Sequence, residues 1–408
     1  MGTQPTALRA RAARVGLVAL LAGAAVVAAC GPQPGGGSPT TTTTTIVTEP
    51  RPPVIHSFTQ RGATGGAPAL VTLAWEVSDP NGDPLTCRID GDGDGTYDLT
   101  VTNCQVPGSR NFPVDSPGPH QARLEVRDGD HDPVTATRAF VVTADVGEPM
   151  DIELRGLEDL DPAIAQAFTD AAARWESVIV RGLPDYVPSS PRPSCLPEDV
   201  DPLPAVLDDV IVDVATPVID GPGEVLGQAG PTCVLSTTEL GIHGIIEIDL
   251  ADAAQMLANG SLGEVIEHEL GHVLGIGTLW DTSWMQQGQR RLLQGSGTSN
   301  PTYRGAAGVA EWSAFGRSGN VPVENSGGPG TAEAHWRETT FHNELMTGYV
   351  NWPPNPMSRL TIGSLADLGY RVDIHAADAY SLPGAAARLR QQPAPEGDWE
   401  RPPAGTAD

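Results

Sequence analysis

The 408-residue chain contains no lysine, and all 24 of its basic residues are arginine, against 51 aspartate and glutamate residues. The formal net charge of −27 therefore argues against nucleic acid or an anionic membrane surface as a partner. The chain also lacks an apolar run that could span a bilayer by itself, because its longest run, residues 15–29, is too short. A chain of this length can nevertheless hold two domains with cores of their own.

An export signal stands at the N-terminus. Three arginines lie in the first 14 residues, and the apolar run that follows ends in small residues directly before Cys30. The stretch Val27-Ala28-Ala29-Cys30-Gly31 resembles a bacterial lipobox, which implies that Cys30 is acylated and becomes the new N-terminus. Ordinary secretion after cleavage near Cys30 is the alternative. We therefore expect residues 1–30 to be a signal peptide and the protein to be an outward-facing membrane lipoprotein, or secreted if it is not lipidated.

Few cysteines remain once Cys30 is set aside. The other four are an even number, as expected for disulfides in an oxidising compartment. Three pairings are possible. We favour the two local ones, Cys87–Cys104 and Cys195–Cys233.

Changes in composition divide the rest of the chain. Residues 31–53 are rich in Gly, Thr and Pro and should form a linker. Residues 54–145 contain short apolar or alternating runs separated by Asp- and Gly-rich turns, which predicts an all-β sandwich. Residues 150–383 mix helical and strand patterns and predict an α+β domain, and residues 384–408 should be a disordered tail. Strands of the sandwich are expected at 69–77, 85–89, 96–102, 121–126 and 137–143.

The sandwich resembles known surface modules. Trp75 followed by Cys87 is similar to an immunoglobulin-like domain, and the Asp- and Gly-rich turns resemble polycystic-kidney-type modules. The resemblance implies a spacer or binding role.

One turn of the sandwich has the spacing of a calcium loop. Asp90, Asp92, Asp94 and Asp98 fall at loop positions 1, 3, 5 and 9, which makes Ca²⁺ a candidate ligand. Position 12, which supplies a bidentate acid in such loops, is Val101. A β-turn rich in Asp and Gly explains the same residues without a metal.

The stretch His268-Glu269-Leu270-Gly271-His272 predicts a zinc site. Residues four apart lie on the same face of a helix, so both imidazoles can bind one ion. Glu269 would then lie beside a zinc-bound water, whose pKa falls to about 7, and could take its proton. Ser261 and Glu264 have the spacing of a capping box that would begin this helix, and Gly275 should end it.

A third zinc ligand is needed, because catalytic zinc sites usually have three protein ligands and one open position. In the short metzincin pattern that place falls on Thr278, a poor zinc ligand. The chain instead has Ala334-His335-Trp336 and, further on, Asn343-Glu344-Leu345-Met346-Thr347-Gly348. With these two motifs and the zinc helix, the region from about residue 151 to 373 resembles leishmanolysin-like metzincin peptidases. The resemblance implies that His335 is the third ligand, in preference to His342.

Residue patterns predict the elements before the zinc helix, and their order resembles the N-terminal subdomain of metzincins. A helix should span 162–180, strands should lie at 151–154, 209–214, 225–235 and 244–250, and the zinc helix should follow. An edge strand within 225–235 is implied to bind extended substrate by β-addition. A methionine turn at Met346 is implied to run under the zinc without binding it, and the insertion 279–334 should fold over the surface.

These features predict an exported zinc metalloendopeptidase with protein or peptide substrates. His268, His272 and His335 would bind zinc, and Glu269 would act as base and then as acid. One alternative is a cell-surface binding protein or adhesin with a structural zinc site, although such a site has no need of Glu269. Another is a zinc hydrolase that acts on cell-wall amides.

Overall fold

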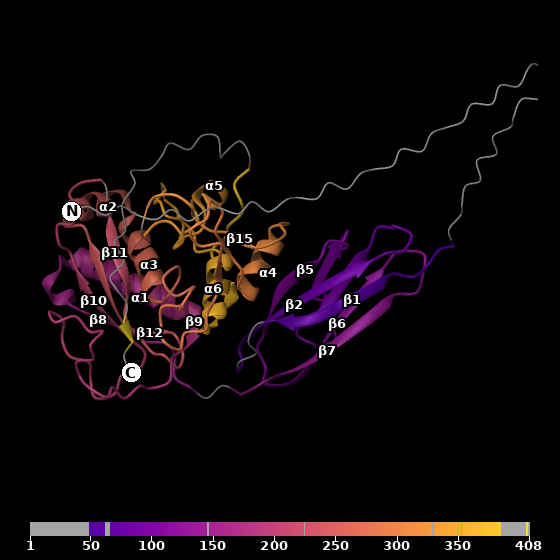
Figure 1. Cartoon of the computed structure of the whole chain (residues 1–408), viewed down its shortest axis with the longest axis horizontal. Coiled ribbons are helices and arrows are strands. Elements are labelled where there is room, and N and C mark those ends of the chain that lie inside the picture. The colour runs from indigo at the N-terminus through magenta and orange to yellow at the C-terminus, as the bar shows by residue number, and fades with distance from the viewer. Residues whose placement is uncertain are drawn as a thin grey trace, which may run out of the picture. The chain divides into compact units, whose positions relative to one another are not determined.

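The computed structural model describes residues 49–61, 66–144, 147–223, 225–328, 330–351, 353–384 and 405–406 (Figure 1). The expected signal peptide with Cys30 and most of the expected linker lie outside the described residues. Within the described ranges, no helix is both long enough and apolar enough to cross a membrane.

The first folded region is an antiparallel β-sandwich. One sheet has the strand order β1-β2-β5 and the other β4-β3-β6-β7. Its core includes Leu73, Trp75, Ile89 and Leu124, all with at most 3% of their surface exposed. The strands are β1 (Val54–Arg61), β2 (Ala69–Ser78), β3 (Thr86–Asp90), β4 (Leu99–Thr102), β5 (Gly108–Val114), β6 (Gly118–Arg127) and β7 (Val134–Val142).

Five of these seven strands agree with the expected runs, whereas β1 and β5 were not expected. Strand β5 contains Gly108 and Pro113, which are poor strand formers, and it carries a buried Asn111. The Asn111 side chain donates hydrogen bonds to the Ala307 carbonyl and to Glu311, which are almost 200 positions away in the chain. Local sequence cannot show such long-range partners.

A five-stranded mixed sheet organises the second region, with the order β17-β11-β12-β10-β8. Strands β8, β10 and β12 are parallel, whereas β11 is antiparallel to β12. Helices α1 and α3 pack against each other, and the Trp175 indole of α1 donates a hydrogen bond to the Glu267 carbonyl of α3. The elements are β8 (Ile152–Arg155), α1 (Pro162–Val178), β9 (Ile179–Arg181), β10 (Val210–Ala215), β11 (Gly227–Val234), β12 (Gly241–Ile248), α2 (Leu250–Asn259) and α3 (Leu262–Val273).

The chain after α3 completes the same core. Its elements are β13 (Leu293–Gln294), β14 (Thr302–Tyr303), α4 (Ala306–Ala314), β15 (Val321–Pro322), α5 (Glu338–Phe341), α6 (Arg359–Leu368), β16 (Arg371–Val372) and β17 (Gly405–Thr406). Strands β13, β14 and β15 form a small sheet of their own, and β16 pairs with β9.

The structure corrects the expectation that the insertion 279–334 folds only over the surface. Trp280 and Tyr303 are fully buried in the main core, with ring centroids 5.0 Å apart, and Trp312 is nearly buried. The Gly, Ser and Asn content of the insertion suggested a surface loop. Its few large aromatic side chains instead anchor the insertion in the core, because each buries a large apolar area.

The capping box expected for the zinc helix is also wrong. Ser261 has helical backbone angles and makes no side-chain cap, and its hydroxyl donates to the Asn259 side chain. Glu264 receives a hydrogen bond from Asn355 instead. The reason is the unexpected helix α2, which ends at Gly260 (φ 82°) and leads directly into α3, so no extended cap residue precedes it.

Two smaller outcomes concern the cysteines and the tail. The disulfides Cys87–Cys104 and Cys195–Cys233 are both formed, which confirms the favoured local pairing.

Within the tail that was expected to be disordered, Gly405–Thr406 pairs in parallel with Cys233 and Val234 of β11. Residues 385–404, 407 and 408 of that tail lie outside the described part of the chain.

Candidate metal centre

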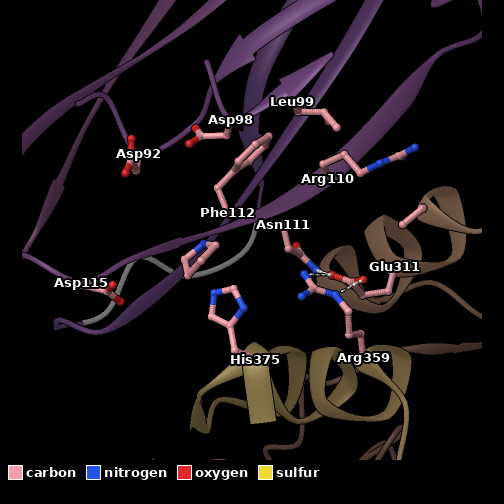
Figure 2. Close-up of a pocket in the computed structure, with 12 residues that line it drawn as sticks. Asp92, Asp98, Leu99, Arg110, Asn111, Phe112, Asp115, Glu311, Arg359 and His375 are labelled. Carbon is pink, nitrogen blue, oxygen red and sulfur yellow. Dashed lines mark hydrogen bonds and ion pairs between the residues drawn. The ribbon is translucent and has the colours of Figure 1, made fainter. Parts of the chain in front are cut away.

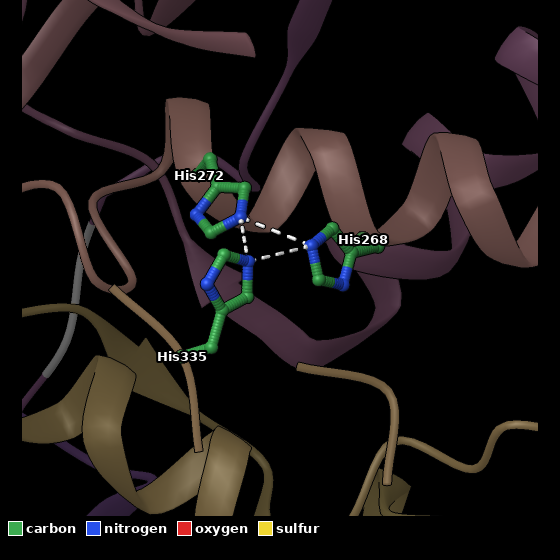
Figure 3. Close-up of side chains that lie close together, drawn as sticks. All are labelled: His268, His272 and His335. Atoms are coloured by element: carbon green, nitrogen blue, oxygen red, sulfur yellow. Dashed lines mark hydrogen bonds between the residues drawn. The ribbon is translucent and has the colours of Figure 1, made fainter. Parts of the chain in front are cut away.

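Helix α3 and the loop before α5 bring three histidines together (Figure 3). The Nε2 atoms of His268 and His335 are 3.1 Å apart, those of His272 and His268 3.0 Å, and those of His272 and His335 2.9 Å. All three side chains are buried, with at most 4% of their surface exposed. His335 therefore joins the helical pair from a position 63 residues beyond His272.

The other nitrogen of each ring determines what these three Nε2 atoms can do. The Nδ1 atoms of His268, His272 and His335 lie 2.7, 2.9 and 2.8 Å from the carbonyl oxygens of Leu345, Ile276 and Thr331, respectively. A carbonyl oxygen only accepts, so each Nδ1 must carry the hydrogen.

Burial favours the neutral form of the His268 ring, because desolvation lowers its pKa to about 4. With the hydrogen on Nδ1 of each ring, the three Nε2 atoms face one another at about 3 Å, an arrangement that a cation between them would stabilise. The three histidines form a group whose nitrogens could hold one metal ion. Such a ligand set fits zinc, which binds imidazole nitrogens and keeps a fourth position open in catalytic sites.

Glu269 is the most unusual charged group of the site. Its side chain is completely buried, and neither carboxylate oxygen has a hydrogen-bond partner in the described structure. Burial without compensation raises its pKa well above the usual range. A Cβ added to Gly227, at the start of β11, would lie 3.6 Å from Glu269 Cγ, so this carboxylate lies beside the edge of the sheet.

The methionine turn packs against α3 where the sequence motif predicted it. A Cβ at Gly271 would lie 2.7 Å from Met346 Sδ, so a larger residue at this position would require the Met346 side chain to shift. The Met346 carbonyl accepts a hydrogen bond from the Trp336 N–H, one residue after His335. Met346 thus contacts segments that carry ligand candidates.

The two alternative ligands are not part of the cluster. The Thr278 hydroxyl donates to the His272 carbonyl and so closes the end of α3. His342 Nδ1 lies 3.4 Å from Glu338, and its side chain is about one-third exposed. Neither residue belongs to the three-histidine group.

Sequence reasoning missed the groups that orient the rings. Backbone carbonyls such as those of Leu345, Ile276 and Thr331 have no residue-type signature, so only the fold could reveal them. Glu344 could be noticed in the sequence, because it belongs to the Glu-Leu-Met motif, but the motif did not predict a role for it.

The aspartate loop of the sandwich is organised by backbone hydrogen bonds. Asp90 accepts from the N–H groups of Gly93 and Gly95, and Asp98 accepts from Gly91. Carboxylate oxygens of Asp90, Asp92 and Asp94 lie within 4.8 Å of one another, and Asp98 is not in that group. Calcium binding by this loop stays a prediction.

A cavity of about 510 Å³ is lined by strand β5 and by helices α4 and α6 (Figure 2). Three of its polar side chains are paired with one another. Asn111 Nδ2 donates to Glu311 Oε1 at 2.9 Å, and Arg359 Nε donates to Glu311 Oε2 at 2.9 Å. The three histidines of the cluster do not line this cavity, and the pairing accounts for Asn111, Glu311 and Arg359 without a ligand.

Comparison with known proteins gives results for both regions. No curated protein matches the chain. Among solved structures, the chain is similar to the PKD1 domain of Vibrio anguillarum Epp, with 20% identity, coverage of 24% of this chain and 100% of that chain, and a TM-score of 0.19. It is also similar to the PKD domain of the human VPS10 domain-containing receptor SorCS2, with 14% identity, coverage of 31% and 100%, and a TM-score of 0.20. Residues 206–386, which include α3, His335 and the methionine turn, match the leishmanolysin family model, and this match points to a metallopeptidase.

Proposed function

We propose that the protein is a zinc-dependent endopeptidase that hydrolyses peptide bonds of extracellular proteins. The observation that carries the proposal is the convergence of three imidazole Nε2 atoms at about 3 Å, next in sequence to a buried carboxylate without partners. A structural zinc site gains nothing from such a carboxylate, because an uncompensated buried charge is costly.

In this proposal His268, His272 and His335 hold the ion. Bound zinc would supply a Lewis acid for the scissile carbonyl and a water of lowered pKa. Glu269 takes the proton of the attacking water and delivers it to the leaving amine. Burial raises the pKa of Glu269 above the usual glutamate value, which makes its carboxylate a stronger base.

Strand β11 offers a place for an extended substrate. Its inner edge pairs with β12, and within the described residues its outer edge is paired only at Cys233 and Val234, by β17. The part of β11 that begins at Gly227, beside Glu269, could therefore add a peptide strand.

Zinc analysis and cleavage of casein by the purified protein test the proposal. We expect one zinc per chain and cleavage that stops when a chelator removes the metal. Zinc without cleavage of casein would contradict the endopeptidase. Release of cell-wall amides would then favour the hydrolase alternative, and neither activity would favour the binding protein.

We also propose that the protein is a membrane lipoprotein that is anchored through Cys30 and faces outward. Cys30→Ser should abolish labelling of cells by a palmitate analogue and release the protein from membranes with its peptidase activity intact. Firm anchoring needs more than one acyl chain, since a single chain binds only marginally. A wild-type protein that takes no label would show that it is secreted without lipid.

A further inference from the structure

Glu344 is a fully buried glutamate two residues before Met346, and its carboxylate receives four hydrogen bonds. Oε1 accepts from the Ser358 N–H at 3.1 Å, from the Ser358 hydroxyl at 2.7 Å and from the Thr361 hydroxyl at 2.6 Å. Oε2 accepts from the Met346 N–H at 2.7 Å. The carboxylate thus connects the methionine turn to the start of helix α6.

The turn that Glu344 holds is in contact with the histidine cluster on two sides. The Leu345 carbonyl, between Glu344 and Met346, receives the Nδ1–H of His268 at 2.7 Å. The Met346 carbonyl receives the N–H of Trp336, next to His335, at 2.9 Å. A shift of the turn would therefore move the hydrogen-bond partner of one ligand candidate and the backbone beside another.

A structural role alone explains this carboxylate poorly. All four donors are uncharged, and a buried carboxylate without a cation is costly compared with an apolar side chain of similar volume. Four directed hydrogen bonds from two separate segments instead determine the position of the turn closely. Groups that orient metal ligands commonly contribute to metal affinity in this way.

We propose that Glu344 is a positioning residue for the metal centre. Its carboxylate holds the Leu345 carbonyl at the place where it orients His268 and keeps the Nε2 lone pair of that ring directed at the ion. The inference rests on the proposed function only in that the histidines bind zinc, and it does not require that the protein cleave peptides.

The test compares zinc affinity in three variants of the full protein by chelator competition. Glu344→Gln keeps the shape of the side chain but turns one oxygen into a donor that faces donors, and we expect zinc affinity to fall about tenfold or more. Asp367→Asn, on helix α6, is the matched control, because that carboxyl also accepts bonds from Tyr303, Ala307 and Gly308 but does not contact the turn. It should lower thermal stability and leave zinc affinity unchanged within about twofold.

Ser358→Ala is a milder variant, since it removes one donor to Glu344 and should weaken zinc about threefold. It decides the question if Glu344→Gln does not fold. Zinc affinity that stays within about twofold of wild type in the folded variants would overturn the inference and leave Glu344 as a structural residue. Zinc binding without casein cleavage in the wild type would refute the proposed function but not this inference.

Discussion

The histidine cluster and the aspartate loop both have metal-ligand spacing in the sequence, but they differ in which side-chain atoms are hydrogen-bonded to the backbone. Each histidine uses Nδ1 for a backbone carbonyl, which directs its Nε2 at the other two rings. Asp90 uses both carboxylate oxygens for backbone N–H groups of its own turn. A metal would therefore complete the first group, whereas the second group is already organised by hydrogen bonds within its own loop.

The comparison shows that ligand spacing alone does not identify a metal site. The decisive feature is whether lone pairs remain and converge after the protein has satisfied its own donors.

His335→Ala should abolish zinc binding and peptidase activity together, because two helical histidines alone do not complete the ligand set. Metal analysis and casein cleavage measure the two effects. His342→Ala is the control and should keep both, since His342 lies beside Glu338 and outside the cluster. If His342→Ala lost the zinc instead, the assignment of the third ligand would be wrong.

Glu269→Gln should keep one zinc per chain and lower the rate of hydrolysis at least ~10²-fold, the usual cost of losing a general base. The substitution changes no ligand candidate, so loss of zinc would point to a disturbed fold. A variant that retained more than a few per cent of wild-type activity would refute the role of Glu269.

Removal of zinc should destabilise the region that holds the histidines and leave the sandwich unchanged. A ligand present at a thousandfold excess over its dissociation constant stabilises the folded state by about 4 kcal/mol. Thermal unfolding with and without a chelator measures this difference, and probes in each region separate the two transitions. An equal shift of both transitions would contradict the contrast between the two sites.

Asp90→Asn should lower the free energy of unfolding of the sandwich by about 1–3 kcal/mol, because the new NH2 group would face the N–H of Gly93 or Gly95 in place of an acceptor. We expect the same loss with and without added Ca²⁺, since the hydrogen bonds do not need the ion. Denaturant unfolding at both conditions provides the measurement. A loss that appeared only with calcium present would establish the loop as a calcium site.

Local chemistry made several features of this protein predictable. The four-residue spacing places His268 and His272 on one face of α3, and Gly275 ends the helix with φ of 106°. The helix expected from residue 162 begins there, and the Asp161 side chain before it accepts from the Ala163 N–H. These features depend on neighbours within a few residues, which the sequence displays directly.

Features that depend on distant neighbours were decided by tertiary structure. The resemblance to a family, and not the spacing, pointed to His335. Packing alone brought its ring to the helical pair and supplied the carbonyl partners that orient all three rings. The burial of Asn111 in β5 and of Tyr303 in the insertion likewise depends on contacts far along the chain. The sequence by itself determined which chemical groups are present and their local conformation, whereas the fold decided which lone pairs meet, because that depends on distances between segments far apart in sequence.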